Sequence, residues 1–140
     1  MTTSTLKSHL FALVAIICLA AFTSCETDED IGYSLAGPNG ITWYGDFGAT
    51  IRHDIPLQSE ITFISGRDSN YGSGRETTYY WNTYDVCSTE PFDWWIENGI
   101  LYMDYRDYTL RIYDYYVGNR TFSGRMENGF EFYMYLDRRW

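Results

Sequence analysis

The clearest structural signal in the chain lies in residues 126–136, which read Met126-Glu127-Asn128-Gly129-Phe130-Glu131-Phe132-Tyr133-Met134-Tyr135-Leu136. From Phe130 onward, apolar side chains fall on one face, while Glu131, Tyr133 and Tyr135 fall on the other. This period of two indicates a β-strand with one buried face. Because a one-residue slip would turn that whole face to water, the alternation also predicts the register of the strand.

The Glu-Asn-Gly triplet in this stretch also occurs thirty residues earlier, at residues 97–99. Asn-Gly pairs favour tight hairpin turns with positive φ angles. The apolar faces imply two different loops. Pairing Ile96 with Leu101 requires a two-residue Asn-Gly turn, whereas pairing Met126 with Phe130 requires a three-residue loop whose glycine is left-handed.

The pair Gly118-Asn119 also consists of residues that favour tight turns, so it predicts another hairpin with a turn of the primed types. The two Asn-Gly hairpins are expected to share one core. The residues predicted to be buried in it are Trp94, Ile96, Leu101, Met103, Phe122, Met126, Phe130, Phe132 and Met134. Arg125 and Glu131 are expected outside, and Trp95 is expected to be more exposed than Trp94.

From Ile41 onward, aromatic and β-branched residues dominate with a period of two, and turn-forming residues interrupt them every eight to twelve positions. Eight strands are expected, near residues 41–51, 59–65, 74–82, 91–97, 100–106, 109–117, 120–126 and 130–137. Residues 66–74 are expected to form a flexible loop and residues 83–90 an irregular stretch. The sequence therefore predicts an all-β fold, an up-and-down antiparallel β-barrel of about eight strands.

The N-terminal part of the chain looks like an export signal. Residues 10–22 are uninterrupted apolar, which is long enough for a signal-peptide core but too short for a membrane-spanning helix of about 20 residues. Phe22-Thr23-Ser24-Cys25 then resembles a bacterial lipoprotein lipobox, with Phe22 in place of the usual Leu. The resemblance implies cleavage before Cys25 and acylation of that cysteine. The alternative is an ordinary signal peptide cut nearby.

The expected domain organisation follows from this reading. Residues 1–24 would be a lipoprotein signal peptide, residues 25–34 an acylated cysteine with a disordered acidic tether, and residues 35–140 the barrel domain. The acidic run in the tether resembles the signal that sends Bacteroidota-type lipoproteins to the outer face of the outer membrane. It implies a lipid-anchored, surface-displayed protein; the alternative is a plain spacer and a periplasmic location. A short helical turn near residues 31–35 is an alternative to disorder there.

Charge and cysteine content exclude some ligands and an intrachain disulfide. Without Lys7, which leaves with the signal peptide, nine arginines face nineteen acidic residues, a formal charge of −10. So acidic a chain is a poor candidate for binding nucleic acid. Cys18 leaves with the signal and Cys25 is expected to be acylated, so Cys87 has no intrachain disulfide partner. The length predicts one domain, expected to be a monomer.

Several structural motifs carry a resemblance to a family. Leu35-Ala36-Gly37 before Trp43, then Ile61-Thr62-Phe63, then Phe92-Asp93-Trp94-Trp95-Ile96 are similar to the small lipocalin-like domains found behind lipoprotein signals in Bacteroidota-type bacteria. The resemblance covers most of residues 35–137 and implies a lipocalin-like barrel. It brings no catalytic motif and no cofactor. The Gly-Pro-Asn-Gly insertion before Trp43 departs from the pattern.

No catalytic or metal-binding motif emerges from the residues. His53 and Asp54 are adjacent, so in a strand they would point to opposite faces and could not act as a base and its orienting group. Asp68 and Asn70 match only the first positions of a calcium loop. We therefore expect no enzyme activity, no metal and no cofactor. The alternatives are a carrier of a small apolar ligand, a protease inhibitor and a hydrolase.

The aromatic content, with 14 tyrosines and 5 tryptophans, exceeds what one small core needs. Large rings favour a filled barrel over an open one. The outward tyrosines Tyr113, Tyr115, Tyr133 and Tyr135 are the candidate binding residues, with plain cross-strand packing as the favoured alternative. We expect a non-enzymatic binding or accessory module, attached to the membrane through Cys25, with a glycan or a protein as partner.

Overall fold

The structure is a computed structural model that describes residues 27–139. The expected signal peptide and the expected acylation site at Cys25 lie outside the described residues. Within them, no helix is both long enough and apolar enough to cross a membrane.

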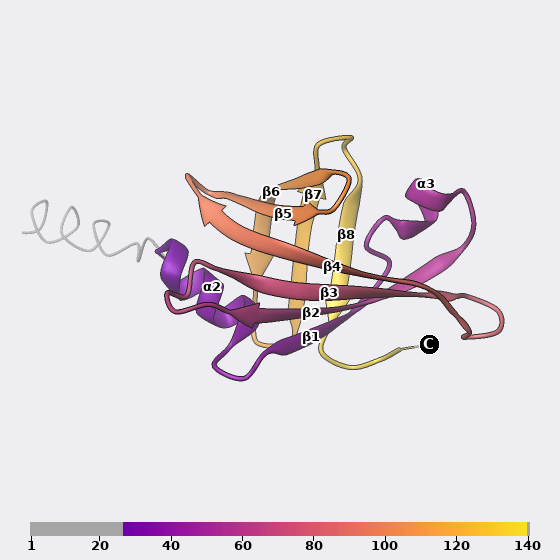
Figure 1. The fold of residues 1–140 in the computed structure, drawn as a ribbon, viewed down its shortest axis with the longest axis horizontal. Helices are drawn as coiled ribbons and strands as arrows, with labels where there is room; N and C mark the ends of the chain where they lie inside the picture. The colour runs from indigo at the N-terminus through magenta and orange to yellow at the C-terminus, as the bar shows by residue number, and fades with distance from the viewer. Residues whose placement is uncertain (1–26, 140) are drawn as a thin grey trace, which may run out of the picture.

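Eight antiparallel strands form a closed up-and-down barrel, which confirms the predicted fold class (Figure 1). The strands are β1 (Ile41–Gly45), β2 (Leu57–Ser65), β3 (Tyr71–Tyr80), β4 (Val86–Glu97), β5 (Ile100–Tyr105), β6 (Thr109–Val117), β7 (Thr121–Met126) and β8 (Glu131–Tyr135). Each strand pairs with its neighbours in sequence, and Tyr44 of β1 pairs with Tyr135 of β8 to close the barrel. Closure removes the exposed sheet edges that invite aggregation.

Both Asn-Gly hairpins have the predicted loops. Ile96 pairs with Leu101 around a two-residue turn in which both central residues have positive φ. At the second hairpin, the Met126 amide donates to the Phe130 carbonyl at 2.8 Å and Gly129 has φ 86°. The prediction for the β6–β7 hairpin was wrong in one respect, because neither Gly118 nor Asn119 has the positive φ that a primed turn requires.

Two strand predictions fail at one end of the barrel. The strand expected over residues 41–51 ends at Gly45, because the chain turns at left-handed Gly48 (φ 75°) into the short helix α3 (Ala49–His53). The stretch 83–90 was expected to be irregular, and only residues 83–85 are; residues 86–90 form the first part of β4, so Cys87 lies in a strand. Strand β4 is 12 residues long and β3 is 10, and their hairpin extends past the rest of the barrel (Figure 1).

The segment expected to be a disordered tether is helical from Asp28 on. Helix α2 (Asp28–Ala36) starts with a capping box, in which the Thr27 hydroxyl accepts from the Asp30 amide and the Asp30 carboxylate accepts from the Thr27 amide. Leu35 and Ala36 at its end are buried, and the Trp43 indole donates to the Leu35 carbonyl at 2.9 Å. The cap and this packing explain why an acidic segment orders here. Helix α2 covers one end of the barrel (Figure 1).

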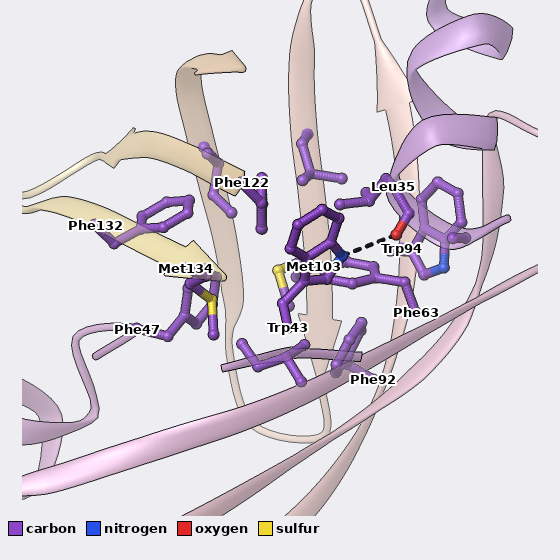
Figure 2. Packing of buried hydrophobic residues seen from close by; sticks show 14 of the residues in the cluster. Leu35, Trp43, Phe47, Phe63, Phe92, Trp94, Met103, Phe122, Phe132 and Met134 are labelled. Atoms are coloured by element: carbon purple, nitrogen blue, oxygen red, sulfur yellow. Dashed lines mark hydrogen bonds between the residues drawn. The ribbon is translucent and has the colours of Figure 1, made fainter. Parts of the chain in front are cut away.

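The interior next to α2 is filled with aromatic side chains (Figure 2). Phe63 of β2 and Phe122 of β7 stand on facing walls, yet their ring centroids are 5.8 Å apart. Phe132 meets the Phe122 ring at 5.0 Å, with an edge-on geometry that aromatic pairs prefer. The rings therefore occupy the space in which a lipocalin would hold a ligand.

The predicted core is confirmed with one exception. Trp94, Ile96, Leu101, Met103, Phe122, Met126, Phe132 and Met134 are all buried. Phe130 is only half-buried, because it sits in the hairpin loop just before β8 and packs against the edge of the core. Glu131 is exposed and Arg125 half-exposed, and Trp95 is more exposed than Trp94, as predicted.

Candidate functional site

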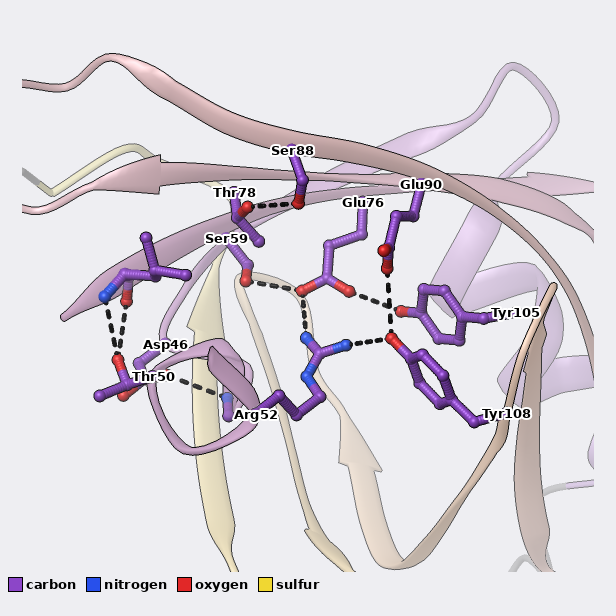
Figure 3. A network of polar contacts seen from close by, with 12 residues as sticks. Asp46, Thr50, Arg52, Ser59, Glu76, Thr78, Ser88, Glu90, Tyr105 and Tyr108 are labelled. Carbon is purple, nitrogen blue, oxygen red and sulfur yellow. Dashed lines mark hydrogen bonds and ion pairs between the residues drawn. The ribbon is translucent and has the colours of Figure 1, made fainter. Parts of the chain in front are cut away.

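The end of the barrel opposite α2 has a polar interior, centred on Glu76 of β3 (Figure 3). Glu76 is 2 % exposed and takes an inward position of the alternation, directly across from Ile61 of β2. Ser59 and Thr78 are buried beside it. Helix α3 lies over this end and brings Arg52 to the opening (Figure 3).

Both carboxylate oxygens of Glu76 have partners. Oε1 accepts from Arg52 Nη2 at 2.6 Å and from the Ser59 hydroxyl at 2.7 Å, and Oε2 accepts from the Tyr105 hydroxyl at 2.7 Å. Arg52 Nη1 also donates to the Tyr108 hydroxyl at 2.6 Å. We call these five residues the Glu76 cluster.

Burial and charge shift the pKa values inside the Glu76 cluster. Burial alone would lower the pKa of Arg52, but the adjacent Glu76 carboxylate outweighs it and leaves the pKa raised. Burial, and then the negative charge of Glu76, raises the pKa of Tyr105 well above its usual range. Burial likewise raises the pKa of Tyr108 to about 12. Arg52 and Glu76 therefore face each other as a charged pair, and both tyrosines stay neutral at physiological pH.

The Glu76 cluster links α3 to the strands of the barrel, and its geometry is unsuited to acid–base catalysis by Glu76. A general base needs a free lone pair within reach of a substrate proton, whereas Glu76 is buried and bonded on both oxygens. His53 is the last residue of α3 and Asp54 follows it, and both are exposed. Among residues 27–139, no three His, Cys, Asp or Glu side chains gather as a metal site would require.

Sequence reasoning missed the Glu76 cluster. The sequence of β3 has no apolar alternation that marks position 76 as inward, whereas in the structure residues 76 and 78 are buried and residues 71, 73 and 75 are exposed. A buried charge requires a partner, but the sequence does not indicate that this partner comes from α3, whose residues 49–51 fall within the expected first strand.

The structure separates the four candidate binding tyrosines. A bulge in β6, with Asp114 at φ 50°, breaks the alternation, so Tyr113 and Tyr115 do not share one face as expected. Tyr115 packs against the core with its hydroxyl buried. Tyr133 is 62 % exposed on the outer surface, and the Tyr135 ring lies under the guanidinium of Arg139.

An exposed aromatic group lies at the end of the β3–β4 hairpin and was not predicted, because Tyr80 and Trp81 were expected to end a strand and Tyr84 to lie in an irregular stretch. Tyr80, Trp81 and Tyr84 are 38 %, 52 % and 53 % exposed. We call these three residues the aromatic tip. Ile55 and Pro56 lie beside it, and together with Tyr80, Trp81 and Asn82 they line a hollow of about 310 Å³.

Other hollows lie on the outer surface or at the barrel ends. One of about 620 Å³ runs over β2 to β5, and its charged lining residues are Arg75, Asp93, Asp104 and Arg106. One of about 460 Å³ lies beside α2 and is bordered by Tyr33 and Tyr116. Like the hollow at the aromatic tip, both are lined in part by solvent-exposed side chains.

These features define a class of protein: a small closed antiparallel barrel of eight strands with an aromatic-filled interior and exposed aromatic residues at one end. The chain matches no protein-family model, no curated protein and no solved structure.

Proposed function

We propose that the protein is a lipocalin-like lipoprotein, acylated at Cys25 and displayed on the outer membrane, that acts as a non-enzymatic binding module through its aromatic tip. The observation that carries this proposal is the exposure of Tyr80, Trp81 and Tyr84 together at the end of a protruding hairpin. Exposed aromatic clusters of this kind mark interaction sites on soluble domains, and Trp and Tyr dominate binding hot spots.

The position of the anchor supports this use of the tip. Cys25 precedes Thr27, the N-cap of α2, by two residues, and two residues of chain span at most about 7 Å. Acylation of Cys25 would therefore hold the α2 end of the barrel near the membrane. The β3–β4 hairpin points away from the α2 end, so the aromatic tip would face outward (Figure 1).

The alternatives from the sequence have less support. A carrier of a small apolar ligand needs an internal cavity, whereas rings from facing walls meet in the middle of this barrel. A hydrolase needs an accessible base, and the carboxylate of Glu76 is buried and bonded on both oxygens. The outward tyrosines Tyr133 and Tyr135 remain a second candidate surface for a glycan or protein partner, on the flank of the barrel.

The proposal can be tested without knowing the partner. A photoreactive benzoyl-phenylalanine is placed at position 81 of the full, lipidated chain, which is then irradiated in the cells that make it. We expect an adduct of increased mass from position 81. The matched control is position 64, because Ile64 is 49 % exposed but lies on the flank of β2. Adducts of equal yield at both positions, or none at position 81, would contradict the proposal.

A further inference from the structure

We infer that the aromatic tip binds a neutral saccharide, with the Trp81 ring stacking on the face of a pyranose ring. This inference rests on the proposed binding function and names the class of ligand. It draws on the backbone at Tyr84, the side chains between the rings, the charge of the surroundings and the size of the hollow.

The backbone at Tyr84 is strained in a way that calls for a reason. Tyr84 has φ 60°, in the left-handed region where a bulky side chain is a real outlier. Its amide donates to the Tyr80 carbonyl at 2.9 Å, which closes a turn where hairpins normally place Gly or Asn. Strained positions that persist cluster at functional sites. A tyrosine that is half exposed gains little from packing at this position, so we attribute its presence to a ligand.

The side chains around the rings match the two chemistries of a sugar. A pyranose offers an apolar C–H face and a rim of hydroxyl groups. The loop that carries the aromatic tip also contains Asn82, Thr83 and Asp85, which are all exposed and can exchange hydrogen bonds with hydroxyls. Amphipathic rings beside amide and carboxylate groups are suited to such a ligand.

The charges near the tip favour a neutral sugar over an acidic one. No cation lines the hollow, whose walls are Ile55, Pro56, Tyr80, Trp81 and Asn82. Asp85 is exposed next to it, and the chain as a whole carries a formal charge of −9. A polyanionic glycan would therefore meet repulsion and find no arginine to bind its carboxylates.

The size of the site favours a small ligand over a folded protein. A hollow of about 310 Å³ is at the lower limit of small-molecule sites, which begin near 300 Å³. A stable protein interface uses about 20–30 residues on each side. The exposed or half-exposed aromatic and apolar residues here are Ile55, Pro56, Val86 and the aromatic tip, which is far fewer.

The backbone that carries the rings is hydrogen-bonded before any ligand arrives. The Trp81 amide donates to the Pro56 carbonyl at 3.2 Å, and the Tyr80 amide to the Asp85 carbonyl at 2.9 Å. Proximity of the Cys87 thiol raises the pKa of Tyr80. A preorganised site loses less conformational entropy on binding.

The test is affinity electrophoresis of the mature domain in gels that contain mixed-linkage β-glucan, xylan, mannan or dextran, with polygalacturonate as the acidic comparison. We expect at least one neutral polysaccharide to retard the domain and polygalacturonate to have no effect. Trp81→Ala should weaken the retardation about tenfold or more. Tyr84→Gly should weaken binding while the thermal midpoint stays equal or rises, because glycine relieves the strain. Tyr116→Ala, an equally exposed ring at the other end of the barrel, is the matched control and should bind like the wild type.

Three results would overturn the inference: no retardation by any neutral polysaccharide, retardation that survives Trp81→Ala, or stronger retardation by polygalacturonate. If no sugar binds but position 81 forms an adduct with a protein in cells, the saccharide is wrong and the proposed binding function stands. If neither sugar binding nor an adduct appears, both are wrong.

Discussion

Arg52 of helix α3 places its Nη2 atom 2.6 Å from Oε1 of Glu76, a residue of β3 whose side chain lies inside the barrel. Helix α3 has only five residues and could not be stable alone, since isolated helices below about 12 residues are marginal in water. The ion pair, together with the bond from Arg52 to Tyr108, attaches this helix across the end of the barrel. The interior of the barrel thus has two parts, an aromatic core beside α2 and a polar cluster beneath α3.

Removal of the arginine should be strongly destabilising. Arg52→Ala leaves the Glu76 carboxylate buried without its cation, which costs about 3–5 kcal/mol in comparable buried pairs. Chemical denaturation of the variant measures the loss. Arg120→Ala is the control, because it breaks an exposed pair with Asp137 and should cost less than about 1 kcal/mol. Equal losses would mean that the Glu76 cluster adds nothing beyond a surface ion pair.

Stability should fall in alkaline solution because of the buried tyrosines. Burial raises the pKa of Tyr108 to about 12, whereas an unfolded tyrosine titrates near 10. The folded state therefore holds protons that the unfolded state releases, so this stability is complete below about pH 10 and is lost as pH rises toward 12. Urea melts between pH 9 and 11.5 should show the decline. Tyr108→Phe should make the free energy of unfolding fall less steeply with pH. Tyr133→Phe, at an exposed position, should leave this pH dependence unchanged.

Tyr115 offers a substitution that should increase stability. Its hydroxyl is buried with no hydrogen-bond partner among the described residues, and burial raises its pKa to about 12. An unpaired buried hydroxyl costs about 1–3 kcal/mol, so Tyr115→Phe should raise the free energy of unfolding by about 1 kcal/mol. Tyr133→Phe, which changes an exposed hydroxyl, should have no effect. A loss of stability in Tyr115→Phe would indicate that the hydroxyl has a partner after all.

The anchor has its own test. Cys25→Ser should move the protein from the membrane fraction to the soluble fraction, because acyl chains on Cys25 would be its strong membrane attachment. Fractionation after a salt wash, followed by immunoblotting, measures the shift. The control is Cys87→Ser, which removes a thiol in β4 and should leave the protein membrane-bound. A Cys25→Ser variant that still sediments with membranes would contradict the lipoprotein assignment.

The parts of the fold that could be predicted are those with local rules. The alternation around Phe132 and the Asn98-Gly99 turn each allow one register, and the structure has it. The parts that were missed depend on contacts between distant segments. Strand β4 begins early because it pairs with a long β3, and Glu76 is buried because Arg52 arrives from a helix 24 residues earlier. The aromatic tip was overlooked because exposure is a tertiary property that Trp81 does not reveal in sequence.

Strand β8 provides the sharpest test of how the fold is held together. Phe132 is 1 % exposed and its ring packs edge-on against Phe47, with centroids 4.7 Å apart, while Tyr133 next to it points outward. Phe132→Ala removes a large buried ring and leaves a cavity, so it should cost about 3–5 kcal/mol. That is a large share of the roughly 5–15 kcal/mol that stabilises a domain of this size.

Tyr133→Ala should cost less than about 1 kcal/mol, because the Tyr133 side chain is mostly exposed and buries little area on folding. Denaturant melts of both variants compare the two faces. Comparable losses would mean that both faces of β8 are buried in solution, as they would be if another chain or surface covered its outer side.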